Sequence, residues 1–338
     1  MDDRQRSPSA TLRHLVNGYQ VSQALHVAAT LGIADRLADG ARTSDDLAAA
    51  VDAHAPTLYR LLRALAAVGV LDEEDGRRFA LTPVGECLRS DAEESVGGWA
   101  AMIGRPYVWQ AWGELMHSVR TGESAFEHIH GVDAWTYRTR HPEEGEIFDR
   151  AMAGLARRAH RTTLAALDFS RFGTVVDVGG GNGALLVALL RAHSHMRGVL
   201  LDLPYAIAVA EHALDEAGLR DRCRTVAGSF FDGVPEGGDA YVLRAILHDW
   251  DDDAATSILR SVRRAAAPEA TLVVIERDLG PPNQNAETRL SDLNMLVIPG
   301  GRERTIDEYG ALLAAAGFTL VESRPAGFGL HVILGAPA

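Results

Sequence analysis

The chain has 338 residues, of which 47% are hydrophobic and 23% charged, a composition typical of a globular protein. Its length exceeds that of one ordinary domain, so we expect more than one. The net charge of −13 argues against a nucleic-acid partner, whose phosphates would repel it. No apolar stretch is long enough for a membrane span, the first residues lack a secretion signal, and Cys87 and Cys223 match no metal or redox spacing, so we expect a cytoplasmic protein without membrane contact.

The first hundred residues show helical patterns followed by a hairpin. Apolar residues at helical spacing predict helices over 11–37, and Thr43, followed by two acids, is typical of a helix start. A leucine stripe over 58–68 indicates the next helix, and residues 73–76 indicate a hairpin turn. Helix, turn, helix and hairpin together form a winged-helix pattern.

A winged helix often binds DNA, and this reading depends on charge. A recognition helix needs a basic face over the phosphates. Between Thr43 and Gly76 the only arginines are Arg60 and Arg63, against seven acidic residues. We therefore expect a dimerisation module or substrate lid, and a winged-helix regulator with a ligand-sensing domain remains the alternative from another class.

From Gly173 onward, short strand-like runs alternate with helical ones, which predicts an α/β domain with a Rossmann-like doubly wound parallel sheet. Strands are expected over 174–178, 199–203, 223–227, 240–243 and 271–275, and helices near 184–193, 205–217 and 254–267. Two further strands, 317–321 and 330–334, follow each other too closely for a crossover helix. They predict an antiparallel C-terminal pair at the sheet edge.

A glycine-rich loop joins the first predicted strand to its helix. Val175–Val178 runs into Gly179-Gly180-Gly181-Asn182-Gly183, where glycines permit a tight bend and close approach of a ligand to the backbone. Asp202 ends the second strand, where an acid would accept hydrogen bonds from ribose hydroxyls. NAD and S-adenosylmethionine both carry such a ribose, so these residues alone leave a dinucleotide oxidoreductase open.

The segments after the third and fourth strands narrow the choice. Ser229 and Phe230 place a flat apolar group beside a polar turn, which suits adenine, and the fourth strand leads through Arg244 into His248-Asp249-Trp250. Here the chain resembles the class I small-molecule O-methyltransferases of the plant caffeate and bacterial polyketide type, whose fourth strand ends in a similar Arg/Lys-x-x-x-His-Asp-Trp stretch. The resemblance covers nearly the whole chain, from the winged-helix module through residues 299–305.

The resemblance implies a domain plan and a cofactor site. Residues 1–100 would form a winged-helix dimerisation domain, 101–165 a helical linker contributing to the substrate cleft, and 166–338 the cofactor domain of a homodimer whose subunits exchange N-terminal helices. S-adenosylmethionine, which leaves as S-adenosylhomocysteine, would bind to the glycine loop, the ribose carboxylate, the adenine segment and the end of the fourth strand. These positions are Gly179, Gly181, Asp202, Ser229, Phe230, Arg244 and Trp250.

The resemblance also implies catalytic and substrate residues. His248 would be the base, oriented by the carboxylates of Glu276 and Glu303. Substrate contacts are implied at Phe148, Met152, Asp249, Met295 and Ile298.

Three positions depart from the family pattern. Ser229 stands where relatives often have aspartate, Ala156 where plant relatives often have serine, and Ile298 where they often have a substrate-contacting asparagine. The last two departures indicate an acceptor that differs from a plant phenylpropanoid.

The chemistry explains why these residue types are needed. A phenol with a pKa of about 10 is protonated at neutral pH, whereas histidine, with an unperturbed pKa of about 6.5, is expected to be neutral and able to accept the proton. A carboxylate such as Glu276 on the other ring nitrogen would fix the tautomer. No step needs a metal, and the run Asp251–Asp253 is better explained as a helix cap. We expect methylation of a hydroxyl on a small aromatic, with a ring nitrogen as the alternative acceptor.

Overall fold

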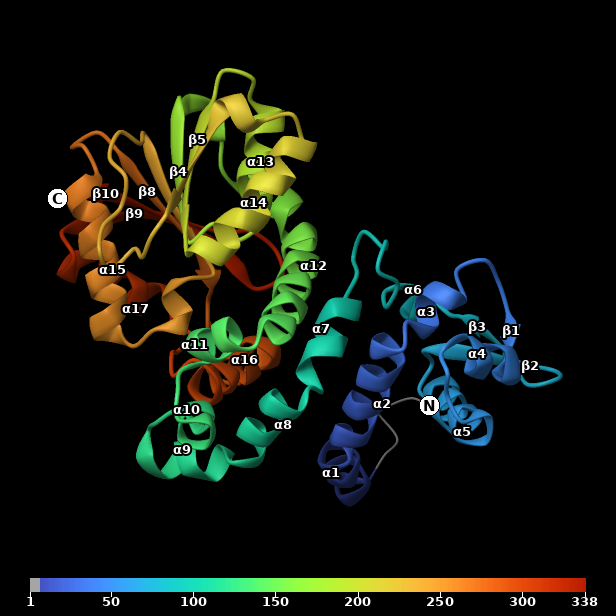
Figure 1. Cartoon of the computed structure of the whole chain (residues 1–338). Helices are drawn as coiled ribbons and strands as arrows, with labels where there is room; N and C mark the ends of the chain where they lie inside the picture. The colour runs from blue at the N-terminus through green and yellow to red at the C-terminus, as the bar shows by residue number, and fades with distance from the viewer. Residues whose placement is uncertain (1–6) are drawn as a thin grey trace. The chain divides into compact units, whose positions relative to one another are not determined.

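The computed structural model describes residues 7–338, apart from the side chains of 156–161. The chain divides into two compact units, one of residues 1–109 and 142–155, the other of residues 110–141 and 156–338 (Figure 1). All three boundaries between the units, after residues 109, 141 and 155, fall inside the segment 101–165 predicted as a linker. Among the described residues, no helix combines the length and apolar character needed to cross a bilayer.

The first unit contains the winged-helix pattern that the sequence predicts. Strands β1, β3 and β2 form a small antiparallel sheet in that order, and the helix after β1 is capped by the Thr43 side chain, which accepts from the Asp46 N–H. The elements of this unit are α1 (Pro8–Val16), α2 (Gly18–Thr30), α3 (Ile33–Arg36), β1 (Arg42–Thr43), α4 (Ser44–Ala50), α5 (Ala55–Ala67), β2 (Leu71–Glu74), β3 (Arg78–Leu81), α6 (Pro83–Glu86) and α7 (Gly97–Ile103). Helix α8 (Pro106–Gly113) begins in this unit, and so does α12 (Pro142–Ala166), which continues into the second.

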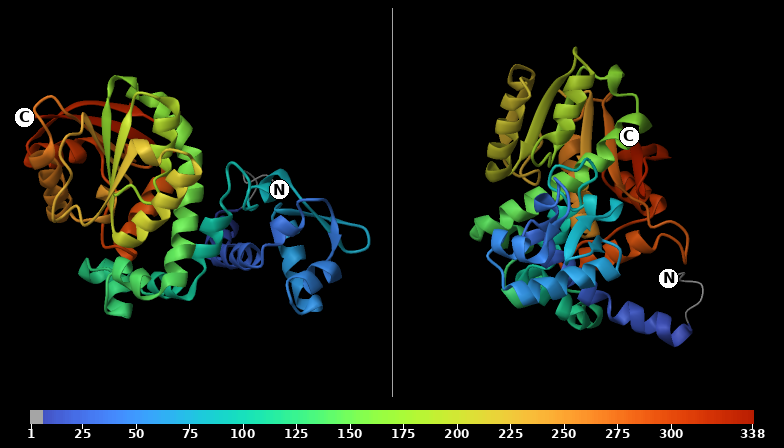
Figure 2. Two further views of the ribbon diagram at one scale, coloured as in Figure 1. Left: turned by 45° about the horizontal axis from the view of Figure 1, so that its top comes forward. Right: turned by 90° about the vertical axis from the view of Figure 1, so that its right-hand side faces the viewer.

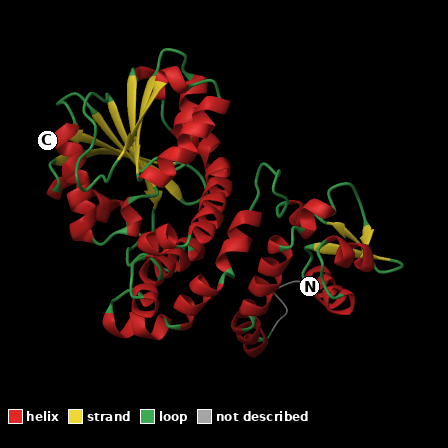
Figure 3. Cartoon of the chain, in the orientation of Figure 1, coloured by secondary structure: helices red, strands yellow, loops and turns green. Residues whose placement is uncertain are grey.

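The second unit is built on a seven-stranded sheet of order β6-β5-β4-β7-β8-β10-β9. The first five strands in this order are parallel, and β10 pairs antiparallel with both β8 and β9, so the predicted fold class is confirmed (Figure 2). Figure 3 shows the strands of both units in yellow. The strands of this sheet are β4 (Thr174–Val178), β5 (Arg197–Asp202), β6 (Cys223–Ala227), β7 (Ala240–Arg244), β8 (Thr271–Arg277), β9 (Phe318–Pro325) and β10 (Leu330–Pro337).

Helices cover both faces of this sheet, and the strand pattern shows why. Val175 belongs to one hydrophobic core and Val176 to the other, as alternating side chains on a strand require. Leucines of α13 (Ala184–Ala192) and α14 (Pro204–Glu216) fill the first core, and side chains of α15 (Asp252–Ala265) and α17 (Ile306–Ala315) fill the second. The remaining elements of the unit are α9 (Leu115–Thr121), α10 (Ala125–His130), α11 (Ala134–Arg140), η2 (Phe169–Arg171), η3 (Arg220–Arg222), η4 (Leu247–Asp249) and α16 (Ala286–Val297).

The strand order fixes where a ligand site can form. The chain moves outward from β4 through β5 to β6, then crosses back to β7 on the other side of β4. In such sheets ligands bind beyond the carboxyl ends of the strands at this reversal of direction. The glycine loop after β4 and the residues after β7 are therefore placed next to each other.

Prediction from packing: replacing Leu186, which is 0% exposed on α13, with alanine removes buried apolar surface and leaves a cavity. We expect the free energy of unfolding to fall by about 2–5 kcal/mol, measured by urea denaturation followed by circular dichroism. The matched control is Val209→Ala on α14, where the side chain is 46% exposed and the change should stay within about 0.5 kcal/mol. Equal effects of the two substitutions would contradict this account of the core.

Candidate active site

His248 lies on the short 3-10 helix η4, directly after β7 at the switch point. Its Nδ1 is 2.9 Å from Oε2 of Glu276 and 3.8 Å from Oε2 of Glu303. Its Nε2 is 3.5 Å from Oδ1 of Asp249. Both glutamate side chains have 0% exposure, while that of His248 is 16% exposed. The structure therefore brings together the three residues expected to be catalytic, with one expected substrate residue beside them.

Each buried carboxylate is held by donors from neighbouring elements. Glu276 is the penultimate residue of β8, and its Oε1 accepts the backbone N–H groups of Ile246 and Leu247 at 2.9 and 2.7 Å. Glu303 accepts the hydroxyl of Ser291 on α16 at 2.8 Å. These bonds leave the Oε2 atoms of both glutamates directed to Nδ1 of His248, while Asp249 faces Nε2 on the other side of the ring.

The pKa of His248 is raised to about 10. Burial is the largest single effect and lowers it, but the negative charges of Glu276, Asp249 and Glu303 together outweigh burial. Burial in turn raises the pKa of Asp249 to about 6 and also raises that of Glu303. A neutral histidine, expected from its ordinary pKa, is therefore not the form that this environment favours at neutral pH, because acidic groups face both ring nitrogens.

The expected cofactor glycines lie close to the other predicted segments. Gly179 has a positive φ of 74°, and a Cβ there would lie 2.5 Å from Ile246 and 3.6 Å from Phe230. Glycine is required because no side chain fits between these segments. The carboxylate of Asp202 accepts the N–H of Gly181 at 2.7 Å and that of Leu203 at 2.6 Å, so it holds the glycine loop in place. Each oxygen keeps a second lone pair with which a hydroxyl could bond.

Aromatic rings surround the expected adenine segment. Phe230 and Phe231 both make edge contacts with Trp250, with ring centroids 6.0 and 4.8 Å apart. The hydroxyl of Ser229 accepts the backbone N–H of Phe231 at 3.2 Å, so it also has a partner within the protein. Phe231, which the sequence did not single out for a role of its own, is therefore part of the same cluster.

Two charged groups lie beneath the glycine loop. Arg244 is the last residue of β7 and is half-buried. Burial lowers its pKa, and the negative charges of Asp177 and Glu276, which raise it, only partly offset this effect. Asp177 in β4 is 2% exposed, and burial raises its pKa to about 7. A Cβ on Gly180 would lie 2.8 Å from Oδ2 of Asp177, so the loop packs directly onto this carboxylate. The sequence assigned Asp177 no role; an acid inside an otherwise apolar strand was the available signal.

The expected substrate residues are divided between the two units. Phe148 and Met152 lie on α12 in the first unit, not among the residues that the second unit gathers around His248. Met295 lies on α16, and its carbonyl accepts the backbone N–H groups of Gly300 and Gly301. Ile298 is 6% exposed, and its carbonyl accepts the Ser124 hydroxyl. The side chain of Ala156 lies outside those described.

A surface pocket of about 650 Å³ lies beside the adenine segment. It contains Ser229 but none of the residues around His248, so it is not the expected acceptor site. Its lining residues are Leu201, Arg224, Val226, Gly228, Ser229, Asp232, Gly233, Val234, Pro235 and Glu236.

The His248, Glu276 and Glu303 group is also the only cluster among the described residues that has the spacing to hold a metal ion. The acidic run at Asp251 instead caps α15, where its carboxylate accepts the Ala254 N–H at 2.8 Å.

Comparison with known proteins gives the family. A family model described as an O-methyltransferase domain matches residues 112–319, and one described as an O-methyltransferase dimerisation domain matches 13–91. The chain belongs to the O-methyltransferase family. It is an S-adenosylmethionine-dependent methyltransferase, and the dimerisation domain supports a homodimer.

Three relatives illustrate the range of the family. Phenazine O-methyltransferase of Lysobacter antibioticus is 41% identical over 329 residues, covering 97% of this chain and 96% of that protein. The crystal structure of an O-methyltransferase from neocarzinostatin biosynthesis, in complex with S-adenosylmethionine and 2-hydroxy-5-methyl naphthoic acid, is 37% identical, with a TM-score of 0.82 and coverage of 94% and 96%. The 8-amino-8-demethylriboflavin N,N-dimethyltransferase of Streptomyces davaonensis is 39% identical over 312 residues, covering 91% and 89%.

Prediction from the electrostatics: Glu276→Gln removes one negative charge facing His248 and lowers its pKa from the value of about 10. Since only neutral histidine accepts a proton, kcat/KM rises with pH as His248 deprotonates, and the rise should move to lower pH by about one unit or more in the variant. The measurement is a pH profile of kcat/KM. Glu269→Gln, at an exposed position before β8, is the control and should keep the original profile. An unshifted profile for Glu276→Gln would mean that the charge of Glu276 does not raise the pKa of His248.

Proposed function

We propose that the protein transfers the methyl group of S-adenosylmethionine to a hydroxyl of a small aromatic secondary metabolite, with His248 as general base. The observation that carries this proposal is the pair of buried carboxylates facing Nδ1 of His248. They hold the proton on Nδ1 and leave Nε2 as the atom that takes the acceptor's proton. We further propose that Asp249, whose Oδ1 is 3.5 Å from Nε2, orients the acceptor hydroxyl.

The residues at the switch point fit the methyl donor. The glycine loop leaves room for a ligand against the backbone of Gly179 and Gly181, and Asp202 has acceptor capacity for ribose hydroxyls. The aromatic cluster of Phe230 and Trp250, with Ser229, supplies a flat surface for adenine, and Arg244 closes the site. When bound, S-adenosylmethionine supplies an electrophilic methyl on a positively charged sulfur.

The raised pKa of His248 fits this chemistry. A positive charge bound beside an imidazolium lowers its pKa, so a sulfonium in the site favours the neutral base. The three carboxylates around His248 keep it strongly basic at the same time, close to a phenol with a pKa of about 10. Proton transfer between groups of similar pKa needs little free energy. The imidazolium that forms when Nε2 takes the proton is stabilised by Glu276 as an ion pair at Nδ1.

Substrate specificity is set by residues other than the proposed base and its carboxylates. We assign substrate contacts to Phe148, Met152, Met295 and Ile298, in addition to Asp249. One relative is named for a phenazine and another was solved in complex with a hydroxynaphthoic acid, both fused aromatic ring systems, which supports an aromatic acceptor here. The relative that dimethylates an amino group favours nitrogen as the second candidate acceptor atom.

The assembly belongs to the same proposal. Leu12, Leu15, Val16 and Tyr19 of α1 and α2 are 55–69% exposed, an apolar surface that a partner subunit would cover. We propose that the subunits of the homodimer exchange these N-terminal helices. We also propose a cytoplasmic location, which the free thiols of Cys87 and Cys223 support, and a reaction that involves neither nucleic acid nor membrane.

Prediction of the base: His248→Ala should lower turnover by roughly 10²–10⁴-fold, while affinity for S-adenosylhomocysteine in calorimetry changes by less than about threefold. The acceptor is found by mass spectrometry, as the gain of one methyl across a panel of hydroxylated and aminated phenazines and naphthoic acids. His212→Ala, on the exposed side of α14, is the control and should retain wild-type turnover. Unchanged turnover in His248→Ala would show that His248 is not the base. Methylation of the amines alone in the panel would show that the acceptor atom is nitrogen and not oxygen.

Prediction on metals: exhaustive dialysis against EDTA should leave turnover unchanged, because the proposed base and its carboxylates act without an ion. Metal analysis of the dialysed protein accompanies the assay. A loss of activity that Mg²⁺ or Zn²⁺ restores would show that His248, Glu276 and Glu303 hold a required metal instead.

A further inference from the structure

Arg304 is completely buried, with 0% exposure, although its side chain carries a permanent positive charge. It lies in the short connection from α16 to α17, of which residues 300–305 are here named the arginine segment. An unpaired guanidinium in the interior is strongly destabilising, so its partners indicate its role.

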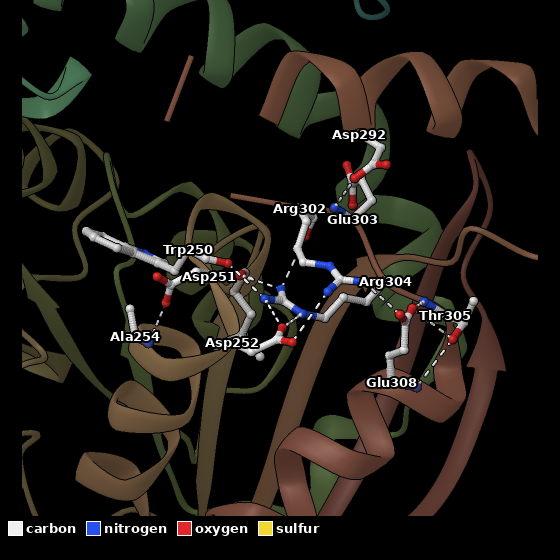
Figure 4. Close-up of polar contacts among 11 residues, drawn as sticks. Trp250, Asp251, Asp252, Ala254, Asp292, Arg302, Glu303, Arg304, Thr305 and Glu308 are labelled. Atoms are coloured by element: carbon white, nitrogen blue, oxygen red, sulfur yellow. Dashed lines mark hydrogen bonds and ion pairs between the residues drawn. The ribbon is translucent and has the colours of Figure 1, made fainter. Parts of the chain in front are cut away.

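Apart from the carbonyl of Arg302 in its own segment, those partners belong to residues 245–252, here named the histidine loop because it carries His248. Figure 4 shows Arg304 with Trp250 and Asp252 of this loop. Arg304 donates from Nη1 to the carbonyl of Leu247 at 2.9 Å and from Nη2 to the carbonyl of Trp250 at 2.8 Å. Its Nε donates to Oδ1 of Asp252 at 2.9 Å. One planar group therefore bonds to the backbone on both sides of His248, a geometry that only a multidentate donor provides.

The backbones of the two segments are also in direct contact. The N–H of Arg302 donates to the carbonyl of His248 at 2.9 Å. A Cβ on Gly301 would lie 2.1 Å from that same carbonyl oxygen and 2.4 Å from the carbonyl carbon of Asp249. Glycine at this position thus permits an approach that brings Arg304 and Glu303 to the histidine loop together.

The histidine loop depends on such external bonds. Its 3-10 turn has three residues, and Ala245 before it has a positive φ of 53°, a conformation that L residues rarely adopt. On the N-terminal side, the carboxylate of Glu276 accepts two backbone N–H groups. On the other side, Arg304 donates to two carbonyls. The loop is held by a buried anion at its amides and a buried cation at its carbonyls.

We propose that Arg304 is a positioning residue that fixes His248 against Glu276 and Glu303 for proton transfer. This inference rests on the proposed role of His248 as base. Arg304 acts through the histidine loop, to which it donates its hydrogen bonds. Asp252, whose side chain is 56% exposed, holds the guanidinium in orientation from the solvent side.

The test uses Arg304→Lys in the full chain, which keeps the charge but donates from a single nitrogen and lacks the planar fork that reaches two carbonyls and Asp252. We expect kcat to fall at least about tenfold, with the KM for S-adenosylmethionine within about threefold of wild type, because geometry and not binding is lost. The assay acceptor is 2-hydroxy-5-methyl naphthoic acid or the compound that the screen identifies.

A second measurement does not depend on turnover. The ring of His248 is titrated by NMR, its signal assigned by its absence in His248→Ala. Its pKa should fall in Arg304→Lys, because the ring moves away from the carboxylates that raise it. Arg260→Lys is the matched control: this exposed arginine on α15 also donates to a backbone carbonyl, that of Ala315, and its replacement should change neither kcat nor the titration.

The outcomes separate the two proposals. If His248→Ala loses turnover but Arg304→Lys retains wild-type kcat and the wild-type His248 titration, the positioning role is overturned and the base stands. A fall in thermal stability alone counts equally against it. If Arg304→Lys does not fold, Asp252→Asn decides: a loss of kcat of about threefold or more with a lowered His248 pKa supports the role, and no change in either overturns it.

Discussion

Burying Glu276 and Glu303 beside one nitrogen of His248 is costly unless every charge receives hydrogen bonds or an opposite charge. Glu276 obtains them from two backbone amides after β7, and Glu303 from Ser291 on α16. These bonds tie β8, α16 and the histidine loop into one arrangement. The reactive group is therefore not an addition to a finished fold, since the same interactions that satisfy the carboxylates determine where the imidazole lies.

The sequence predicted the fold well wherever local pattern and burial agree. Residues 174–178 are largely apolar and buried, and both β4 and the more polar β6 have the predicted bounds. Within the predicted cofactor domain, residues 166–338, two α-helices were not predicted. Helix α17 carries a recognisable capping box of Thr305 and Glu308, a signal that was available. Helix α16 begins after Asn285, with φ of 55° and no side-chain cap, so nothing local announces its start.

The site was predictable only as far as family resemblance and strand ends allow. His248, Glu276 and Glu303 do meet, but their effect on the pKa of His248 depends on distances and burial that no one-dimensional pattern contains. Arg304 shows the same limit. In the sequence it is one of many arginines, and only the path of the chain between α16 and α17 buries it against the histidine loop. Interactions between segments about 50 residues apart have no local signature.

The basicity of His248 bears on the acceptor atom. A hydroxyl must lose its proton as it attacks, and a base with a pKa near that of a phenol accepts this proton at little cost. An aromatic amine attacks with a lone pair it already has and releases a proton only afterwards, when even a weak base suffices. Two fully buried carboxylates that raise the basicity of one histidine would be an expensive arrangement for the amine reaction. They are well matched to the hydroxyl reaction, which is why the geometry favours oxygen.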